Sequence, residues 1–391
     1  MSRPRTTTVA VVTGTRAEFG LLRPVIAAIE AHASLRARVV VAGTHLLPPA
    51  HTGRQVAAEF PVAARVPMQR DPDRPRADDA LAVGRGVTGF ARCFARLGPD
   101  VVLVLGDRVE AFAAAAAASV AGIAVAHAHG GDRAEGIADE AMRHAITKLA
   151  HLHLPASKRS ARRIVRMGEP HDRVILVGSP AVDGLAGLPP LPDALAATLG
   201  DPAAVLLMHP AGLPPAAEAA WADAAIALAL RVTTGAVLAL DPNHDPGRSH
   251  VLSRLDAAAA SNPRLRRCHH LPRDRFVALL KRLALGSPRG CIVGNSSAAL
   301  IESAAIGLPA LNLGPRQAGR EHGPNVAHVP DLPTSPRRLA ELARQFAALL
   351  KSPRARASSR FGDGNAAARI AEALARLDTA DPTLLRKRNS Y

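Results

Sequence analysis

Aromatic side chains are scarce in this chain of 391 residues, where Phe, Tyr and Trp together make up 3% of the sequence. The hydrophobic fraction is nevertheless 48%, mostly Ala, Val and Leu, which predicts a core of aliphatic helices and strands. The net charge of +16 comes mainly from Arg spread along the chain, and only residues 386–388 form a basic cluster. Because basic runs interleaved with aromatics are missing, we expect no nucleic-acid partner, only a positive field that attracts anionic small molecules.

Cysteine is also rare, and the three present, Cys93, Cys268 and Cys291, form no Cys-x-x-Cys pair. Such scattered thiols argue against a disulfide framework or a zinc site and fit a reducing compartment. The N-terminal segment lacks the apolar stretch and cleavage site of a signal peptide. The Ala-rich run at residues 111–126 is shorter than the roughly 20 residues that a membrane helix requires. The sequence thus predicts a cytoplasmic protein with no membrane contact.

Short β-branched runs alternate with longer amphipathic segments, a rhythm typical of βαβ units and a parallel sheet. A break rich in Pro and Gly at residues 187–192 separates two such series, as a domain linker would. The predicted fold is α/β, with two Rossmann-like parallel-sheet domains facing a central cleft. We assign residues 1–186 to the first domain and 187–363 to the second, with 364–391 a helix crossing back to the first domain and a flexible tail. Strands are predicted at residues 9–13, 38–42, 101–105, 124–127, 152–155, 204–208, 236–240, 290–294 and 309–313.

Two turns in the first half place polar groups at the ends of strands, where open α/β sheets bind ligands. The turn at residues 13–20 offers backbone N–H groups and Arg16 to an anion, although a purely structural βα loop has the same pattern. Asp107 follows the strand at residues 101–105 and suits a general base or a sugar contact, or equally a helix cap.

The densest polar stretch covers residues 127–144, directly after a predicted buried strand. Burying so many ionisable groups costs free energy, which favours a functional role. A metal site at His127 and His129 is disfavoured, because no third ligand follows at a recognisable spacing. We therefore predict no metal and a catalytic or sugar-binding role for this stretch, which contains His127, His129, Asp132, Glu135, Asp139, Glu140, Arg143 and His144.

The second half also carries polar side chains after its predicted strands. His209 ends one strand, and residues 241–247 form a loop that has either a ligand-binding role or that of an ordinary turn. Residues 293–297 precede a predicted helix at 298–306, so free N–H groups and serine hydroxyls there suit a diphosphate, or a plain serine cap. Glu302, one turn into that helix, suits ribose hydroxyls, and Arg316 and Arg320 suit phosphate or carboxylate groups.

Taken together, these segments resemble the hydrolysing UDP-N-acetylglucosamine 2-epimerases of the branch that feeds sialic-acid-type sugars. The resemblance implies a glycosyltransferase-B-like fold, a UDP-sugar or other phosphate-activated sugar as partner, no metal, no tightly bound cofactor, and commonly a homodimer. In that family the proton at sugar C2 is removed and UDP leaves, giving a 2-acetamidoglucal intermediate to which water adds at C1. The matching pieces run in order along the chain: TGTRAEFGLLRPVI, LGDRVEA, GGDRAEGIADEAMRHAITKLAHLHLPAS, VGSPAVD, MHP, PNHDPG and VGNSSAALIESAAIGLPALNLGPRQAGRE.

The resemblance also implies roles for individual residues. Asp107 and Asp139 match acidic residues of the proton transfer, and His209 matches a histidine near the leaving phosphate. With His129 and Glu140, these form the predicted catalytic set. Substrate and nucleotide binding is predicted for Arg16, Glu18, His45, Asp132, Glu135, Arg143, Asn243, Gly294, Asn295, Ser296, Ser297, Glu302, Arg316 and Arg320.

Two positions depart from the family pattern. Where the family usually has His-x-Glu-Gly-Gly, this chain has His129 in place of the catalytic carboxylate. A neutral imidazole can still act as a base, and Glu135 or Glu140 can compensate. If the missing carboxylate is the only deficit, the substitution His129→Glu should raise 2-epimerase activity. The loop at residues 46–51 departs as well, which indicates a changed sugar.

The predicted function is a hydrolysing 2-epimerase acting on UDP-N-acetylglucosamine or a modified UDP-hexosamine. One alternative keeps the fold for transfer at an activated anomeric carbon, joining a phosphorylated sugar to a base or another acceptor. A second alternative is a nucleotide-sugar binder that does not turn its ligand over.

Overall fold

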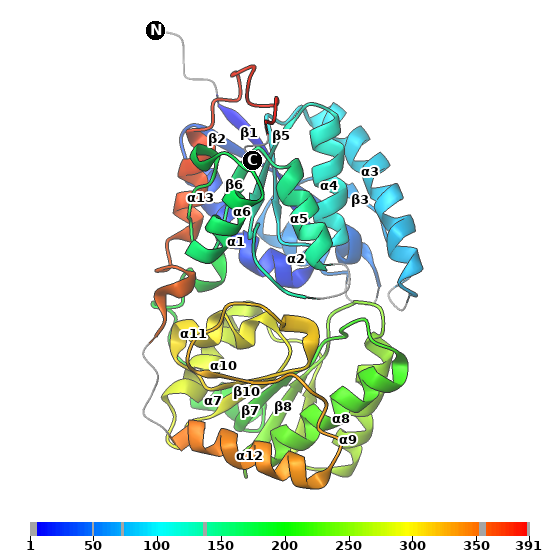
Figure 1. Ribbon diagram of the computed structural model, residues 1–391, viewed down its shortest axis with the longest axis vertical. Coiled ribbons are helices and arrows are strands. Elements are labelled where there is room, and N and C mark those ends of the chain that lie inside the picture. The colour runs from blue at the N-terminus through cyan, green and yellow to red at the C-terminus, as the bar shows by residue number, and fades with distance from the viewer. Residues whose placement is uncertain (1–5, 49–50, 72–73, 136–138, 352–356, 389–391) are drawn as a thin grey trace. The chain divides into compact units, whose positions relative to one another are not determined.

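The computed structural model describes residues 6–48, 51–71, 74–135, 139–351 and 357–388, with the side chain of Asp139 outside the described part. The chain forms two α/β units (Figure 1). Unit 1 comprises Met1–Asp132, Ala138–Asp183 and Phe361–Tyr391, and unit 2 comprises Arg133–Ile137 and Gly184–Arg360. No helix in the described part is long and apolar enough to cross a membrane.

Unit 1 is built on a six-stranded parallel sheet in the order β3-β2-β1-β4-β5-β6. Helices α1 and α13 pack on one face, and helices α3, α4 and α5 cover the other (Figure 1). Because both faces are covered, the inner strands are continuous apolar runs such as VVLVL in β4. The strands are β1 (Thr7–Thr13), β2 (Leu35–Ala42), β3 (Val62–Val66), β4 (Val101–Leu105), β5 (Ala124–Ala128) and β6 (Leu152–Leu154). The helices are α1 (Arg16–Ala31), α2 (Gly53–Glu59), α3 (Ala77–Leu97), α4 (Val109–Val120), α5 (Asp139–Leu149), α6 (Lys158–Arg166) and α13 (Ala366–Ala375), with the 3-10 turns η1 (Gly43–Leu46), η2 (His171–Arg173), η3 (Pro180–Val182) and η6 (Ser359–Phe361), of which η6 spans the unit boundary.

Unit 2 repeats this plan with a parallel sheet in the order β12-β11-β10-β7-β8-β9. Counted within its own unit, each sheet has the doubly wound strand order 3-2-1-4-5-6, in which ligands bind at the carboxyl ends of the strands. The prediction of two Rossmann-like parallel sheets is thus confirmed. The strands are β7 (Pro202–Leu207), β8 (Ala236–Leu240), β9 (Leu265–Cys268), β10 (Cys291–Gly294), β11 (Ala310–Leu313) and β12 (Val326–Val329). The helices are α7 (Asp193–Thr198), α8 (Pro215–Val232), α9 (Arg248–Ser261), α10 (Arg273–Leu285), α11 (Glu302–Ile306) and α12 (Pro336–Lys351), with the 3-10 turns η4 (Ser297–Ala299) and η5 (Pro315–Gln317).

Two details of the structure differ from the sequence predictions. Strands β3, β9 and β12 were not predicted, and each lies at an edge of its sheet, where strands are short and carry polar side chains. The helix predicted at residues 298–306 is divided into η4 and α11, with Leu300 and Ile301 outside both. Glu302 is therefore the first residue of α11 and does not lie one turn inside a helix that starts at the serines.

Candidate active site

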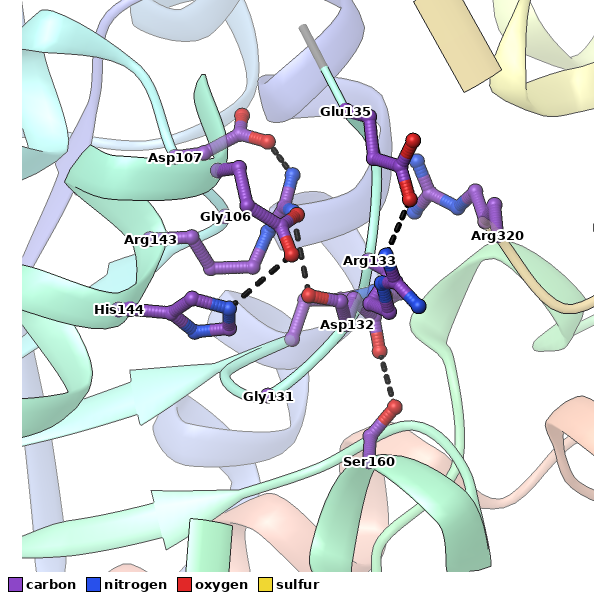
Figure 2. A network of polar contacts seen from close by, with 12 residues as sticks. Gly106, Asp107, Gly131, Asp132, Arg133, Glu135, Arg143, His144, Ser160 and Arg320 are labelled. Atoms are coloured by element: carbon purple, nitrogen blue, oxygen red, sulfur yellow. Dashed lines mark hydrogen bonds and ion pairs between the residues drawn. The ribbon is translucent and has the colours of Figure 1, made fainter. Parts of the chain in front are cut away.

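The carboxyl end of β4 presents an ion pair between Asp107 and Arg143, which face each other in Figure 2. Asp107 lies in the turn after β4, and Arg143 projects from α5. The Arg143 side chain is only 2% exposed, whereas that of Asp107 is 24% exposed. A buried guanidinium that donates to a carboxylate fixes the orientation of the carboxylate and leaves its other lone pairs for a ligand.

Arg143 joins three segments of unit 1. Besides Asp107, its guanidinium contacts the Glu140 carboxylate at 3.3 Å and donates to the carbonyl oxygen of Asp132 at 3.2 Å. His144 in turn contacts Glu140 at 3.1 Å. Glu140, Arg143 and His144 share one face of α5, since residues three and four apart are neighbours on a helix. The structure thus brings Asp107, Asp132, Glu140 and Arg143 together.

His129 directly follows β5 and has a left-handed backbone with φ of 61°, which costs a non-glycine residue about 1–2 kcal/mol. Its ring is 4% exposed, with Nδ1 at 2.9 Å from Asp132 Oδ2 and Nε2 at 3.0 Å from Ser179 Oγ. The second oxygen of Asp132 accepts from the Ser160 hydroxyl at 2.7 Å (Figure 2). A carboxylate only accepts hydrogen bonds, so Nδ1 donates and Nε2 accepts from Ser179. Both ring nitrogens of His129 are engaged, and its role as a base stays a prediction.

A second polar cluster lies at the carboxyl ends of β1 and β2 in unit 1. Glu18 is 5% exposed and accepts from the backbone N–H of Gly14 at 2.6 Å; burial raises the pKa of its carboxyl to about 8. His45 is 1% exposed and contacts Thr13 Oγ1 at 3.0 Å and Thr52 Oγ1 at 2.7 Å; burial lowers its pKa to about 4.

Arg16, the half-buried first residue of α1, belongs to this region as well. Glu110, a fully buried residue of α4, was not predicted as a site residue; it accepts from the Gln69 side-chain amide at 2.8 Å and faces Arg108. Its position three residues after Asp107 in the LGDRVEA segment was the available signal. The contacts of Glu18 and His45 are with the protein itself, and their predicted substrate contacts stay predictions.

In unit 2, His209 follows β7 and is held by two asparagines. The side chain of Asn295 accepts from the His209 backbone N–H at 2.7 Å and donates to its carbonyl at 2.8 Å. The backbone N–H of Asn243 donates to His209 Nδ1 at 3.1 Å. Because Nδ1 accepts, the neutral ring carries its hydrogen on Nε2. His209 thus offers an N–H donor, the form that suits a phosphate oxygen.

The segment after β10 combines a glycine with two serines. Gly294 has φ of 141°, and a Cβ there would overlap the Leu207 carbonyl, so only glycine fits. Ser296 caps η4 by accepting from the Ala298 N–H at 3.3 Å, and Ser297 is half-buried.

Glu302, 5% exposed, accepts from the Arg273 guanidinium at 2.9 Å, a partner that the sequence analysis did not identify. The serines and Glu302 stay predicted contacts of the diphosphate and the ribose.

Two arginines after β11 complete the group in unit 2. Arg316 donates to the carbonyl of Asn295 at 3.1 Å, and Gln317 donates to the same oxygen at 3.2 Å. Arg320 donates to Gln317 Oε1 at 3.1 Å. Glu135 donates its backbone N–H to the Ala318 carbonyl at 3.1 Å, and its carboxylate pairs with Arg133 (Figure 2).

The candidate residues therefore form three groups, two in unit 1 and one in unit 2. Asp139 begins α5, but its side chain lies outside the described residues, so its predicted catalytic role stays a prediction. The groups are Asp107, His129, Asp132, Glu140 and Arg143; Arg16, Glu18 and His45; and Glu135, His209, Asn243, Gly294, Asn295, Ser296, Ser297, Glu302, Arg316 and Arg320.

Comparison with solved structures places the fold in the glycosyltransferase-B-like class of paired Rossmann-like sheets. The UDP-GlcNAc 2-epimerase of Methanocaldococcus jannaschii, in complex with UDP-GlcNAc and UDP, matches with a TM-score of 0.76 and 17% identity, covering 94% of this chain and 99% of that one. The enzyme of Neisseria meningitidis bound to UDP-GlcNAc matches with a TM-score of 0.74 and 18% identity, covering 95% and 100%. At such identities the likeness establishes the fold.

Sequence comparison identifies the family. Residues 27–375 match the family described as UDP-N-acetylglucosamine 2-epimerase. A UDP-N,N'-diacetylbacillosamine 2-epimerase (hydrolyzing) of Legionella pneumophila is 32% identical over 97% of this chain and 98% of its own length. A UDP-N-acetylglucosamine 2-epimerase of Neisseria meningitidis serogroup B is 30% identical over 81% of this chain and 82% of its own. The chain belongs to the UDP-N-acetylglucosamine 2-epimerase family.

Proposed function

We propose that this protein is a hydrolysing 2-epimerase that converts a UDP-linked 2-acetamido sugar, UDP-N-acetylglucosamine or a modified relative, into UDP and the free 2-epimeric sugar. Two relatives, from Legionella pneumophila and Campylobacter jejuni, are named as hydrolysing enzymes. The observation that carries the proposal is the partly exposed Asp107 carboxylate held by buried Arg143 at the carboxyl end of β4. A proton-transfer group needs this combination of access to the substrate and fixed orientation.

Unit 1 supplies the groups for the first step. A carboxylate, Asp107 or Asp139, takes the proton at C2, and the C–H electron pair forms the C1–C2 double bond. The bond between C1 and the phosphate oxygen breaks, and UDP leaves with that electron pair. Arg143 keeps Asp107 in place during the transfer by holding it against α5.

The second step is an addition, the reverse of the elimination in the first step. Water adds its oxygen to C1 of the glycal and gives one proton to a base, while an acid delivers a proton to C2 on the face opposite to the one that lost it. The products are the free 2-epimeric sugar and UDP. An acid and a base on opposite faces of the ring are required, and the two carboxylates paired with Arg143, Asp107 and Glu140, are candidates from unit 1.

Unit 2 supplies donors for the departing nucleotide. His209 offers Nε2–H, which suits a phosphate oxygen that gains charge as the C1–O bond breaks. Arg316 and Arg320 add fixed positive charge, and guanidinium groups suit phosphates. Ser296 and Ser297 follow the tight turn at Gly294, which lets the backbone approach an anion.

The experiment incubates the purified protein with UDP-N-acetylglucosamine and, separately, with UDP-N,N'-diacetylbacillosamine, and follows UDP by chromatography and the free sugar by NMR. We expect UDP and a free 2-epimeric sugar in equal amounts from at least one substrate, and the ratio of the two kcat/KM values identifies the preferred sugar. If neither substrate yields UDP, the proposal is wrong. Saturable binding of UDP-sugar by calorimetry without turnover would then support the non-catalytic binder.

The engaged ring of His129 favours one second candidate, transfer at the anomeric carbon. Both its nitrogens are committed to Asp132 and Ser179, so this position offers no free base for C2. If neither Asp107 nor Asp139 takes the proton at C2 in its place, substitution at C1 by another acceptor is the remaining route. In deuterated water the epimerase route places deuterium at C2 of the product, whereas transfer leaves the hydrogen at C2 unlabelled.

Two further properties stay predictions from the family resemblance. A homodimer would appear in sedimentation velocity at about twice the chain mass of 40.7 kDa. A cytoplasmic location would appear as activity recovered in the cytosolic fraction of fractionated cells.

A further inference from the structure

His127 is a buried imidazole that the proposed mechanism does not use. It is fully buried in β5, two residues before His129. Its Nε2 lies 2.7 Å from the carbonyl oxygen of Gly106, the residue that precedes Asp107. Because a carbonyl only accepts, Nε2 carries the hydrogen. The Gly106 N–H in turn donates to the Ala128 carbonyl at 2.9 Å, so both polar groups of Gly106 are tied to β5.

The other nitrogen of His127 contacts α5. Nδ1 lies 3.3 Å from the hydroxyl oxygen of Thr147, which in turn lies 3.0 Å from the carbonyl oxygen of Arg143, and the single hydroxyl hydrogen is donated to one of these two acceptors at a time. Thr147 is fully buried and lies four residues after Arg143. One imidazole therefore connects the turn that carries Asp107 with the helical turn that carries its partner Arg143.

The ring of His127 is confined in position and in charge. A Cβ at residue 130 would lie 2.9 Å from His127 Nδ1 and 3.1 Å from Thr147 Oγ1, so only glycine leaves room for the pair. Burial lowers the pKa of His127 to about 3, so the ring stays neutral near neutral pH. A neutral imidazole keeps one donor and one acceptor, which this arrangement of a carbonyl and a hydroxyl requires.

We propose that His127 is a positioning residue for the reaction, and that with Thr147 it sets the distance and orientation between the Asp107 turn and Arg143 without touching the substrate. This inference rests on the proposed function, because it assigns His127 to the geometry of a proton-transfer group. An apolar side chain would fill the same volume without the desolvation cost of two buried nitrogens. Buried hydrogen bonds that orient functional groups commonly change activity about 10–100-fold when removed.

The test compares His127→Leu with His127→Gln. Leucine fills a similar volume but makes no hydrogen bond, whereas the glutamine amide can donate to the Gly106 carbonyl from near the position of Nε2. We expect His127→Leu to lower kcat about 10–100-fold with KM for the UDP-sugar changed less than about threefold. His127→Gln should recover most of that loss, because the donor to Gly106 is restored.

His151 provides a matched control. It is also buried, and its Nδ1 accepts from the Val125 N–H at 3.0 Å at the opposite end of β5. His151→Leu therefore removes a buried hydrogen bond from the same strand but far along it from Asp107. We expect His151→Leu to lower thermal stability and leave kcat within about threefold of the unsubstituted enzyme. Equal kcat losses at residues 127 and 151, or no benefit of Gln over Leu, would overturn the proposal.

Two further measurements keep the outcome decisive. If His127→Leu does not fold, Thr147→Val removes only the hydroxyl, and the proposal requires it to lower kcat at constant KM. If the unsubstituted protein releases no UDP from any UDP-hexosamine, the proposed function fails by itself. Crystal structures of the variants then still test the positioning role of His127. We expect the contact between Asp107 and Arg143 to be intact in His127→Gln and displaced in His127→Leu.

Discussion

The carboxyl ends of the two sheets differ in chemistry, although the sheets share one strand order. In unit 1 the side chains there are ionisable and paired inside the protein, as in Asp107 with Arg143 and His129 with Asp132. In unit 2 the Asn295 amide bonds to both backbone polar groups of His209 after β7, while Asp241 after β8 forms ion pairs with Arg248 and Arg267. The same topology thus supports two tasks, and the side chains after the strands decide which one.

This contrast suggests a division of labour in catalysis. Paired ionisable groups hold protons in defined places, which suits the edge of the unit 1 sheet for proton transfer. At the edge of the unit 2 sheet, the Nε2–H of His209 and the guanidinium groups of Arg316 and Arg320 are donors that suit an anion. Substitutions at the carboxyl edge of the unit 1 sheet should therefore change kcat, and substitutions at the carboxyl edge of the unit 2 sheet should change substrate affinity.

Replacing Asp107 by Asn should have the largest effect. The amide cannot take a proton from C2, so kcat should fall about 1,000-fold, within the range for general acid–base groups. The measurement is steady-state UDP release. Asp100→Asn is the control, since Asp100 lies before β4 and accepts from the Thr8 N–H at 2.8 Å, a bond that Asn retains. A decrease below tenfold for Asp107→Asn would contradict the role of this residue.

Glu18→Gln tests whether the buried Glu18 carboxyl of unit 1 is protonated near neutral pH in the folded protein. The folded-state pKa of about 8 lies above the ordinary value of 4.5, so stability is fully present below pH 4.5 and is lost as pH rises through 8. Gln does not titrate, so the variant should match the unsubstituted protein near pH 4.5 and exceed it increasingly toward pH 8. Each pKa unit corresponds to about 1.4 kcal/mol, which makes the gap several kcal/mol. Urea unfolding at pH 5 and pH 8 measures it, and an equal gap at both values would contradict the assignment.

His129→Glu separates the sequence-based expectation from the structural one. The family pattern alone predicts a gain in epimerase activity. In the structure a carboxylate there would face Asp132, which lies 2.9 Å from the present imidazole, and two buried carboxylates repel each other. We expect a loss of about 3 kcal/mol in the free energy of unfolding and lower activity. A folded variant with raised kcat would instead show that the missing carboxylate was the only deficit.

Arg316→Met should have the smallest of these effects and a different character. If Arg316 binds phosphate as predicted, its removal should raise KM about 10–100-fold with kcat changed only slightly, which corresponds to roughly 1.4–2.7 kcal/mol. Arg337→Met, on the exposed start of α12, is the matched control and should leave both constants unchanged. If Arg316→Met lowered kcat by a larger factor than it raised KM, the assignment of proton transfer to unit 1 and nucleotide binding to unit 2 would be contradicted.

The fold was predictable from the sequence wherever the strands are buried. Runs such as VVLVL are continuous and apolar because helices cover both sides of the sheet. Strands such as LRRC in β9 gave no such signal, since an edge strand pairs on one side only and tolerates arginine.

The candidate site was predictable as a set of residue types but not as a set of contacts. The polar stretch at residues 127–144 stood out in the sequence, and its predicted catalytic or sugar-binding role stays a prediction. The bond between His129 and Ser179 joins residues 50 positions apart, and no local pattern reveals such a contact. Glu110 was missed although it stands three residues after Asp107, because it directly precedes an Ala-rich run that is typical of an apolar helix.

The division of labour is tested most directly by calorimetric titration of UDP into the unsubstituted protein and its Asp107→Asn and Arg316→Met variants. The account predicts that Asp107→Asn binds UDP with unchanged affinity, whereas Arg316→Met binds it at least about tenfold more weakly. A loss of UDP affinity in Asp107→Asn equal to that in Arg316→Met would contradict the separation of proton transfer from nucleotide binding.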